Sequence, residues 1–204
     1  YGEIETLGPI AHNQQLVEEL RKEGVKPVNH LDQVQGKILA ISTHGASPVM
    51  LSEIEARDIH IIDTTCPIVR KAQNVAKELA QAGFDVIIFG EAEHSEVKGL
   101  LGWAREKGIA ALDVEQIVSY KKAKQALSLH RLGIISQTTQ TKSAFIEFAR
   151  QLMITFGSKA KEVRIINTLC QAVQKRQEAA LSLAKRGQLM IVIGGYNSAN
   201  TKHL

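Results

Sequence analysis

Short runs of apolar residues alternate along the chain with longer stretches in which apolar residues recur every three or four positions. A short continuous apolar run is typical of a strand buried on both faces of a parallel sheet, and helical spacing predicts an amphipathic helix. The chain is therefore predicted to be an α/β protein. Strands are expected within 1–12 and at 37–42, 59–63, 86–89, 109–112, 132–136, 162–166 and 190–193, and helices at 14–22, after Pro48, after Cys66, after His94, at 143–156 and after Cys170.

One segment of the chain recurs. Residues 61–97 predict a strand, a cysteine turn, a helix, a second strand and a polar loop, and residues 165–200 repeat this order. The identical positions include the pairs Ile61 and Ile165, Thr64 and Thr168, Cys66 and Cys170, Gly83 and Gly187, and Gly90 and Gly194. A partial copy at the start of the chain aligns Gly8 with Gly90 and His12 with His94. Such internal repetition indicates a fold built from repeated structural units.

The repeat predicts three similar parallel-sheet α/β units around a pseudo-threefold axis with a central cavity. The expected units are residues 1–65, 66–164 and 165–204. By the same alignment, the first unit would carry its cysteine ahead of Tyr1, and the third would continue beyond Leu204. We therefore expect the chain to be an internal piece of a longer protein.

Polar side chains follow the predicted strands at equivalent places in the units. His12, His94 and Ser198 share one such place, and His44 follows another strand. Because ligands of open α/β sheets bind at the carboxyl ends of the strands, these residues are expected to face one cavity. Histidine, serine and asparagine side chains at helix starts suit a phosphate or diphosphate group. Each alone could instead cap a helix or stabilise a turn, but the repeat favours binding.

Glu96 lies two residues after His94 in the same predicted loop. A carboxyl group among histidines and hydroxyls can donate or relay a proton. A glutamate at a helix start can equally be held there by the helix dipole. The spacing leaves both interpretations open.

Both cysteines, Cys66 and Cys170, follow a strand and precede a helix. A helix N-terminus stabilises a thiolate, and two cysteines so far apart form neither a disulfide framework nor a zinc knuckle. With a third thiolate they would suit an iron–sulfur cluster, or a zinc ion completed by histidine. Their equivalent places in separate units favour the cluster.

The composition is that of a globular domain, with 44% hydrophobic and 23% charged residues. The apolar runs are too short to span a bilayer and no signal peptide is visible, so a cytoplasmic location is expected. Lysine and arginine are dispersed and aromatic residues make up only 4%, which argues against nucleic-acid binding. The net charge of +4 fits a small anionic substrate.

Seven motifs along the whole chain closely resemble the 4-hydroxy-3-methylbut-2-enyl diphosphate reductase family. They are, in order, GPIAHN, STHGASP, DTTCPIV, GEAEHSEV, SQTT, NTLCQAVQKRQ and GGYNSAN. The resemblance implies a three-domain α/β enzyme with a central, oxygen-sensitive 4Fe-4S cluster on three cysteines. Such enzymes reductively remove an allylic hydroxyl to give isopentenyl and dimethylallyl diphosphate in the non-mevalonate route. It further implies a ferredoxin or flavodoxin as electron donor, and the plastid stroma as an alternative location in a plastid-bearing organism.

The resemblance also implies roles for single residues. Cys66 and Cys170 would be cluster ligands, with the third cysteine outside this chain. Glu96 would protonate the departing oxygen, and Thr138 would lie near the substrate hydroxyl. The implied diphosphate contacts are His12, His44, His94, Ser198, Asn200 and the backbone of Ala199.

Some positions depart from the family's usual motifs. GEAEHSEV stands for the usual GHEGHPEV, so that Glu91 and Glu93 add negative charge near the expected diphosphate site. Ala199 stands where a second serine is usual, and Ser136 where threonine is usual.

Three other interpretations stay open at this point. They are a cluster-free α/β module that binds a phosphorylated small molecule, a zinc-dependent hydrolase built on His12, His44 and His94, and a repeat protein without activity. We expect the 204-residue piece by itself to be inactive.

Overall fold

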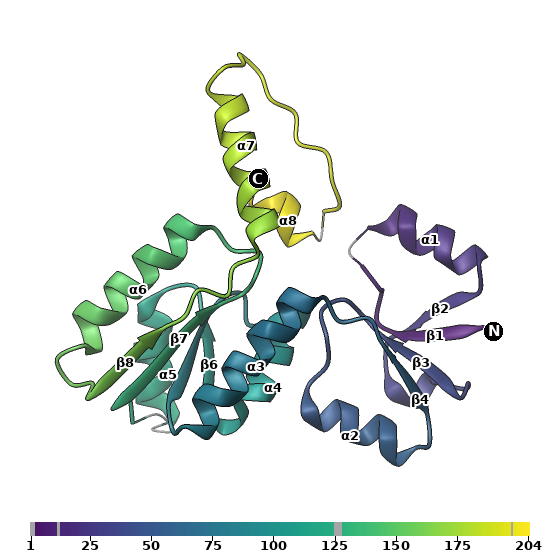
Figure 1. Ribbon diagram of the computed structural model, residues 1–204, viewed down its shortest axis with the longest axis horizontal. Coiled ribbons are helices and arrows are strands. Elements are labelled where there is room, and N and C mark those ends of the chain that lie inside the picture. Colours follow the sequence, from purple (N-terminus) through teal and green to yellow (C-terminus); the bar gives the residue numbers. More distant parts are fainter. Residues whose placement is uncertain (1–2, 12, 125–127, 197) are drawn as a thin grey trace.

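The computed structural model describes residues 3–11, 13–124, 128–196 and 198–204. Two separate four-stranded sheets form the body of the molecule, with two helices between them in the view of Figure 1. Every strand pair in both sheets is parallel. The predicted α/β class with parallel sheets is therefore confirmed.

The first sheet has the strand order β2-β1-β3-β4. Its strands are β1 (Ile4–Leu7), β2 (Val25–Val28), β3 (Ile38–Ile41) and β4 (His60–Asp63). The helical segments of this part are α1 (Gln14–Lys22), the 3-10 helix η1 (Leu31–Gln33) and α2 (Pro48–Ala56). Pro48 begins α2, where its missing N–H costs nothing, and the Ser47 hydroxyl accepts a hydrogen bond from the Met50 N–H.

The second sheet repeats this order as β6-β5-β7-β8. Its strands are β5 (Asp85–Phe89), β6 (Gly108–Ala111), β7 (Arg131–Ser136) and β8 (Glu162–Ile165). The helical segments around it are α3 (Pro67–Gln81), α4 (Ser95–Ala104), the 3-10 helix η2 (Arg105–Lys107), α5 (Val114–Lys124) and α6 (Lys142–Phe156). Gly8 follows β1 and Gly90 follows β5, so the aligned glycines occupy equivalent places in the two sheets.

Both faces of the second sheet are covered. Ile87 and Phe89 of β5 belong to a core shared with α5 and α6, whereas Val86 and Ile88 belong to a core shared with α3 and α4. Successive side chains of a strand point to opposite faces, which explains why this strand is an uninterrupted apolar run. A smaller core, which includes Ile54 of α2, supports the first sheet.

The third predicted unit forms no sheet within the residues described. After β8 the chain continues through α7 (Gln171–Ala184), an extended segment and α8 (Ala199–Lys202). The strand expected at 190–193 is wrong, since Ile191 and Ile193 are exposed and no described strand lies beside them. A strand requires hydrogen bonds from a neighbour, so its apolar sequence alone does not form it.

Strand β2 is an element that the sequence analysis missed. It contains Pro27, which counts against a strand in sequence, but β2 lies at the edge of its sheet, where the missing proline N–H can face away from the ladder. Within the described residues, no helix is both long and apolar enough to cross a membrane.

Candidate functional site

The two sheets present their switch points to a common cavity. In each sheet the two central strands, β1 and β3 or β5 and β7, connect onward to strands at opposite edges. Loops that follow such a pair of strands diverge and leave a crevice, which is where open α/β sheets bind ligands. The loops after all four strands contribute residues to one cavity of about 240 Å³. We call it the switch-point cavity.

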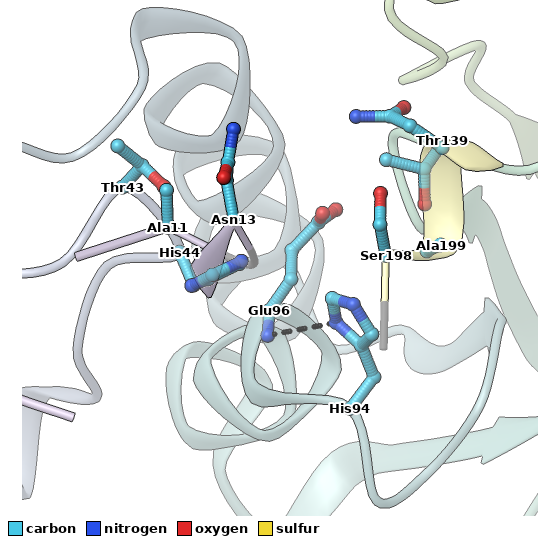
Figure 2. Close-up of a pocket in the computed structure, with 10 residues that line it drawn as sticks. Ala11, Asn13, Thr43, His44, His94, Glu96, Thr139, Ser198 and Ala199 are labelled. Atoms are coloured by element: carbon cyan, nitrogen blue, oxygen red, sulfur yellow. Dashed lines mark hydrogen bonds between the residues drawn. The ribbon is translucent and has the colours of Figure 1, made fainter. Parts of the chain in front are cut away.

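Short helix α8 completes the wall of this cavity. The described lining consists of Ala11, Asn13, Thr43, His44, His94, Glu96, Thr139, Ser198, Ala199 and Asn200 (Figure 2). The structure thus brings together six residues that the sequence analysis placed at the site, namely His44, His94, Glu96, Ser198, Ala199 and Asn200. His12, which was predicted with them, lies outside the described residues.

Three helices begin at the cavity, and the residue that caps each of them lines it. Asn13, His94 and Ser198 cap α1, α4 and α8, and their side chains accept hydrogen bonds from backbone N–H groups of the first helical turn at 3.2, 3.2 and 3.3 Å. The free N–H groups and the dipole of a helix start favour anions. His94 and Ser198 are equivalent in the sequence repeat, and the structure gives both the same capping position.

His44 and His94 approach each other from the two sheets. Their rings lie at 78° with centroids 5.6 Å apart. Nδ1 of His94 accepts the backbone N–H of Glu96, so a neutral His94 carries its proton on Nε2. Figure 2 shows Glu96 between the two rings, with its carboxyl group extended between the Asn13 and Ser198 side chains. The arrangement combines hydrogen-bond donors with one carboxyl group.

Glu96 is only 2% exposed although it reaches the cavity. Oε1 accepts the Thr138 N–H at 2.7 Å, and Oε2 accepts the Thr138 hydroxyl at 2.9 Å. Burial raises the pKa of Glu96 to about 7, because removing the carboxylate from water outweighs the two hydrogen bonds, which lower the pKa. A carboxyl group with this pKa can carry and release a proton near neutral pH.

Thr138 does not line the described cavity, whereas its neighbour Thr139 does. The hydroxyl of Thr138 is used by Glu96, so the structure places Thr138 as the partner of the carboxyl group. The sequence analysis did not assign Ala11, Asn13 or Thr43 to the site. All three lie inside the motifs GPIAHN and STHGASP, which is the signal that could have identified them.

The two cysteines lie one hydrogen bond away from the loops of the cavity. Cys66 donates its N–H to the Thr43 carbonyl at 3.0 Å, and Cys170 donates its N–H to the Thr138 carbonyl at 2.8 Å. Cys66 begins α3 and Cys170 begins α7, so both occupy the same position in the repeated unit. Neither is among the described residues that line the switch-point cavity.

Both thiols have properties suited to a ligand of a metal–sulfur group. They are free, only partly exposed and placed at helix N-termini. No group of three His, Cys, Asp or Glu side chains suited to a metal ion occurs in the part of the chain that the structure describes. The described residues therefore offer two free thiols but no complete metal site.

The two additional glutamates of GEAEHSEV lie apart from the cavity. Glu93 forms an ion pair of 2.8 Å with Lys98, and this hydrogen bond lowers the pKa of Glu93. The backbone N–H of Glu91 donates to Oε1 of Gln137 at 3.2 Å. Neither glutamate is among the described lining residues, so Glu96 is the acidic side chain in that lining.

Comparison with known proteins identifies the family. A family model described as LytB protein matches residues 1–204. The chain belongs to the LytB family. The match includes both sheets, the cavity loops and the two cysteine turns, so the LytB assignment rests on the same residues as the site.

Relatives in the LytB family carry a common name. A protein of Dehalococcoides mccartyi named 4-hydroxy-3-methylbut-2-enyl diphosphate reductase is 42% identical, over 100% of this chain and 70% of its own length. A protein of the same name from Campylobacter curvus is 38% identical, over 100% of this chain and 71% of its own length.

Two solved structures share the fold. One is described as (E)-4-hydroxy-3-methyl-but-2-enyl diphosphate reductase, the terminal enzyme of the non-mevalonate pathway. It matches with a TM-score of 0.73 and 36% identity, over 98% of this chain and 69% of its own. The other is described as the E-1-hydroxy-2-methyl-but-2-enyl-4-diphosphate reductase from Plasmodium falciparum. It matches with a TM-score of 0.86 and 26% identity, over 99% of this chain and 62% of its own.

Proposed function

We propose that the protein is a reductase that removes the allylic hydroxyl of (E)-4-hydroxy-3-methylbut-2-enyl diphosphate, giving isopentenyl and dimethylallyl diphosphate. The observation that carries the proposal is the buried Glu96, held by Thr138 beside two histidines and three helix starts in a chain of the LytB family. The site thus offers a proton donor and an anion-binding wall within one small cavity.

The diphosphate binds, in this proposal, to the wall made by His44, His94, Ser198 and Asn200, together with the backbone of Ala199. The N–H groups at the starts of α1 and α4 add fixed positive potential. His12 is proposed as a further contact from its place in the sequence repeat. The lining contains no second carboxylate among its described residues that would oppose the anion.

Glu96 supplies the proton that the leaving oxygen needs. Reductive removal of an allylic hydroxyl consumes two electrons and two protons. One proton leaves with the oxygen as water and the other is added to the allylic carbon. Protonation of the oxygen by a positioned acid makes it a better leaving group. With a pKa of about 7, Glu96 carries its proton in a large part of the molecules at neutral pH and regains it afterwards.

The electrons require a redox group, and the two cysteines are the residues that would hold it. We propose that Cys66 and Cys170, with a third cysteine outside this chain, bind a 4Fe-4S cluster. When bound, such a cluster supplies electrons singly and a Lewis-acidic iron. Thr43 and Thr138, whose carbonyls accept the cysteine N–H groups, fix both cysteines relative to the cavity loops.

We propose a ferredoxin or flavodoxin as the electron donor. The cytoplasm, or the plastid stroma in a plastid-bearing organism, is the proposed location. Both proposals follow from the resemblance in sequence.

The test is iron and acid-labile sulfide analysis of the complete gene product after reconstitution without oxygen. It is combined with turnover driven by reduced methyl viologen and mass spectrometry of the products. We expect stoichiometric iron and sulfide, and both five-carbon diphosphates as products. Cys170→Ser should lose the iron, while Ser158→Ala, on an exposed turn, should retain it. A colourless protein that binds the diphosphate without turnover would instead support the cluster-free binding module.

A further inference from the structure

A second cavity, of about 360 Å³, lies on the cysteine side of the molecule. Cys170 lines it, together with residues near the starts of α3 and α7, including Ile68 and Lys71 of α3. Both helices begin near the centre of the molecule (Figure 1). No described residue lines both this cavity and the switch-point cavity. Cys170 therefore connects the two cavities. Its N–H group is bonded to the Thr138 carbonyl, next to the loop of the switch-point cavity, and Cys170 itself lines the second cavity.

Lys71 of α3 lines the second cavity, and two further cations lie on α7. Gln171 and Ala172 line the second cavity, and Lys175 and Arg176 follow each of them by four residues, one helical turn along the same face. The opposite face of α7 packs inward. Its buried residue is Val173, and its inward hydrogen bonds are those of Gln174 to the Gln140 carbonyl and of Gln177 to the Thr139 carbonyl.

Lys71, Lys175 and Arg176 are exposed, and no ion pair within the described residues involves any of them. In contrast, Arg70 is paired with Asp63, Arg131 and Arg164 are paired with Glu162, and Lys77 lies over the Trp103 ring. No ion pair of the described residues engages the charge of Lys71, Lys175 or Arg176, which can therefore act on a partner.

We propose that Lys71, Lys175 and Arg176, around the cavity that Cys170 lines, form the docking surface for a small acidic electron-carrier protein. We call it the basic docking surface. Its charge would steer an acidic carrier, and Ile68, which is 38% exposed and lines the second cavity, offers an apolar contact. The proposal rests on the proposed reductase function, because it assigns the place where electrons enter.

The electron balance requires two encounters for each turnover. In each encounter a one-electron carrier would give up one electron at this surface, and Cys66 and Cys170 would hold the redox group that accepts it. The two electrons and two protons then replace the carbon–oxygen bond by a carbon–hydrogen bond and release water. Docking at the second cavity leaves the switch-point cavity open to the substrate.

The test uses a bacterial flavodoxin, a small acidic flavoprotein, as the probe. Its dissociation constant from the reconstituted complete protein is measured by flavin fluorescence at low and high ionic strength. Lys71→Glu and Lys175→Glu should each raise the constant about tenfold at low ionic strength, and the effect should shrink as salt is added. Lys159→Glu is the matched control, because exposed Lys159 precedes β8, whereas the cysteine turn follows the other end of this strand.

A second readout is the ratio of flavodoxin-driven to viologen-driven turnover. This ratio should fall about tenfold in Lys71→Glu and Lys175→Glu and stay unchanged in Lys159→Glu. Equal flavodoxin affinity in all three variants would overturn the docking surface. If the unsubstituted protein shows no turnover with viologen, the proposed function fails instead, and the two failures are thereby distinguished.

Discussion

Both carboxyl oxygens of Glu96 accept hydrogen bonds from a single residue, Thr138. The backbone N–H donates at 2.7 Å and the hydroxyl at 2.9 Å. The two residues are 42 positions apart and follow the neighbouring strands β5 and β7. Thr138 therefore fixes the orientation of a carboxyl group whose burial raises its pKa to about 7. Proton donation and its pH dependence should both depend on this pair.

Glu96→Gln removes the acidic proton and keeps the size of the side chain. We expect turnover with reduced methyl viologen to fall by about a hundredfold or more, because the leaving oxygen loses its proton donor. Iron and sulfide content should stay normal. Glu93→Gln, which changes an exposed glutamate paired with Lys98, is the control. Undiminished turnover in Glu96→Gln would remove this residue from the mechanism.

The reaction should slow as pH rises through about 7, since Glu96 must be protonated to act as an acid. Thr138→Val removes the hydroxyl bond that favours the ionised carboxylate, so the pKa of Glu96 should rise further. The alkaline limb of the pH–rate profile should then move to higher pH. Thr138→Ser keeps the hydroxyl and should keep the limb in place. If the alkaline limb lies at the same pH in the natural protein, Thr138→Val and Thr138→Ser, the limb reports the titration of another group.

Glu96 should also make stability depend on pH. Its pKa is raised from 4.5 in water to about 7 in the fold, so the folded state binds a proton that the unfolded state loses first. The stability contributed by this proton is complete below about pH 4.5 and is lost as pH rises through about 7. Between these limits, the free energy of unfolding should fall by about 3 kcal/mol more in the natural protein than in Glu96→Gln.

Chemical denaturation at several pH values measures this difference. Glu93→Gln should follow the natural protein, because its carboxylate is exposed and paired with Lys98. If the free energy of unfolding changes equally with pH in the natural protein and in Glu96→Gln between about pH 4.5 and 7, the raised pKa is contradicted.

Gly45, beside His44, should tolerate no side chain. Its φ angle is +75°, and an added Cβ would lie 2.3 Å from Nε2 of the buried Gln73. Gly45→Ala should lower stability by about 2 kcal/mol and weaken diphosphate binding, because the loop that carries His44 must move. Gly8→Ala is a matched control. Its φ angle is +72° but nothing lies within 4 Å of an added Cβ, so it should cost only about 1 kcal/mol.

Thermal denaturation and calorimetric titration with inorganic diphosphate measure both effects. The same loss of stability in Gly45→Ala and Gly8→Ala would show that the contact with Gln73 costs nothing beyond the backbone conformation.

Local patterns in the sequence predict most elements of the two sheets. The helical spacing of 14–22 and the apolar run at 86–89 correspond to α1 (Gln14–Lys22) and to most of β5 (Asp85–Phe89). The alignment of Gly8 with Gly90 predicts equivalent strands, and the sheets repeat one strand order. These features follow from the residues of one segment, since helix formation and burial patterns depend on neighbours in the chain.

The two errors in predicting strands, at 190–193 and at β2, have the same cause. The apolar run at 190–193 has the sequence of a strand but no described partner strand, whereas β2 contains Pro27 and still forms because β1 lies beside it. Pairing between strands is a tertiary property, so neither outcome could be read from the segment alone.

The residue patterns were enough to predict the α/β class, the repeated unit, the family resemblance and six of the residues that line the cavity. They could not show that Thr138 holds Glu96 while Thr139 lines the cavity, or that Asn13, His94 and Ser198 cap helices at one place, because these contacts join distant parts of the chain. The raised pKa of Glu96 is also a tertiary effect, because desolvation arises where loops from distant parts of the chain close around the carboxyl group. The residue type of Glu96 makes proton transfer chemically possible, and packing sets the pKa of its carboxyl group and gives it Thr138 as a partner.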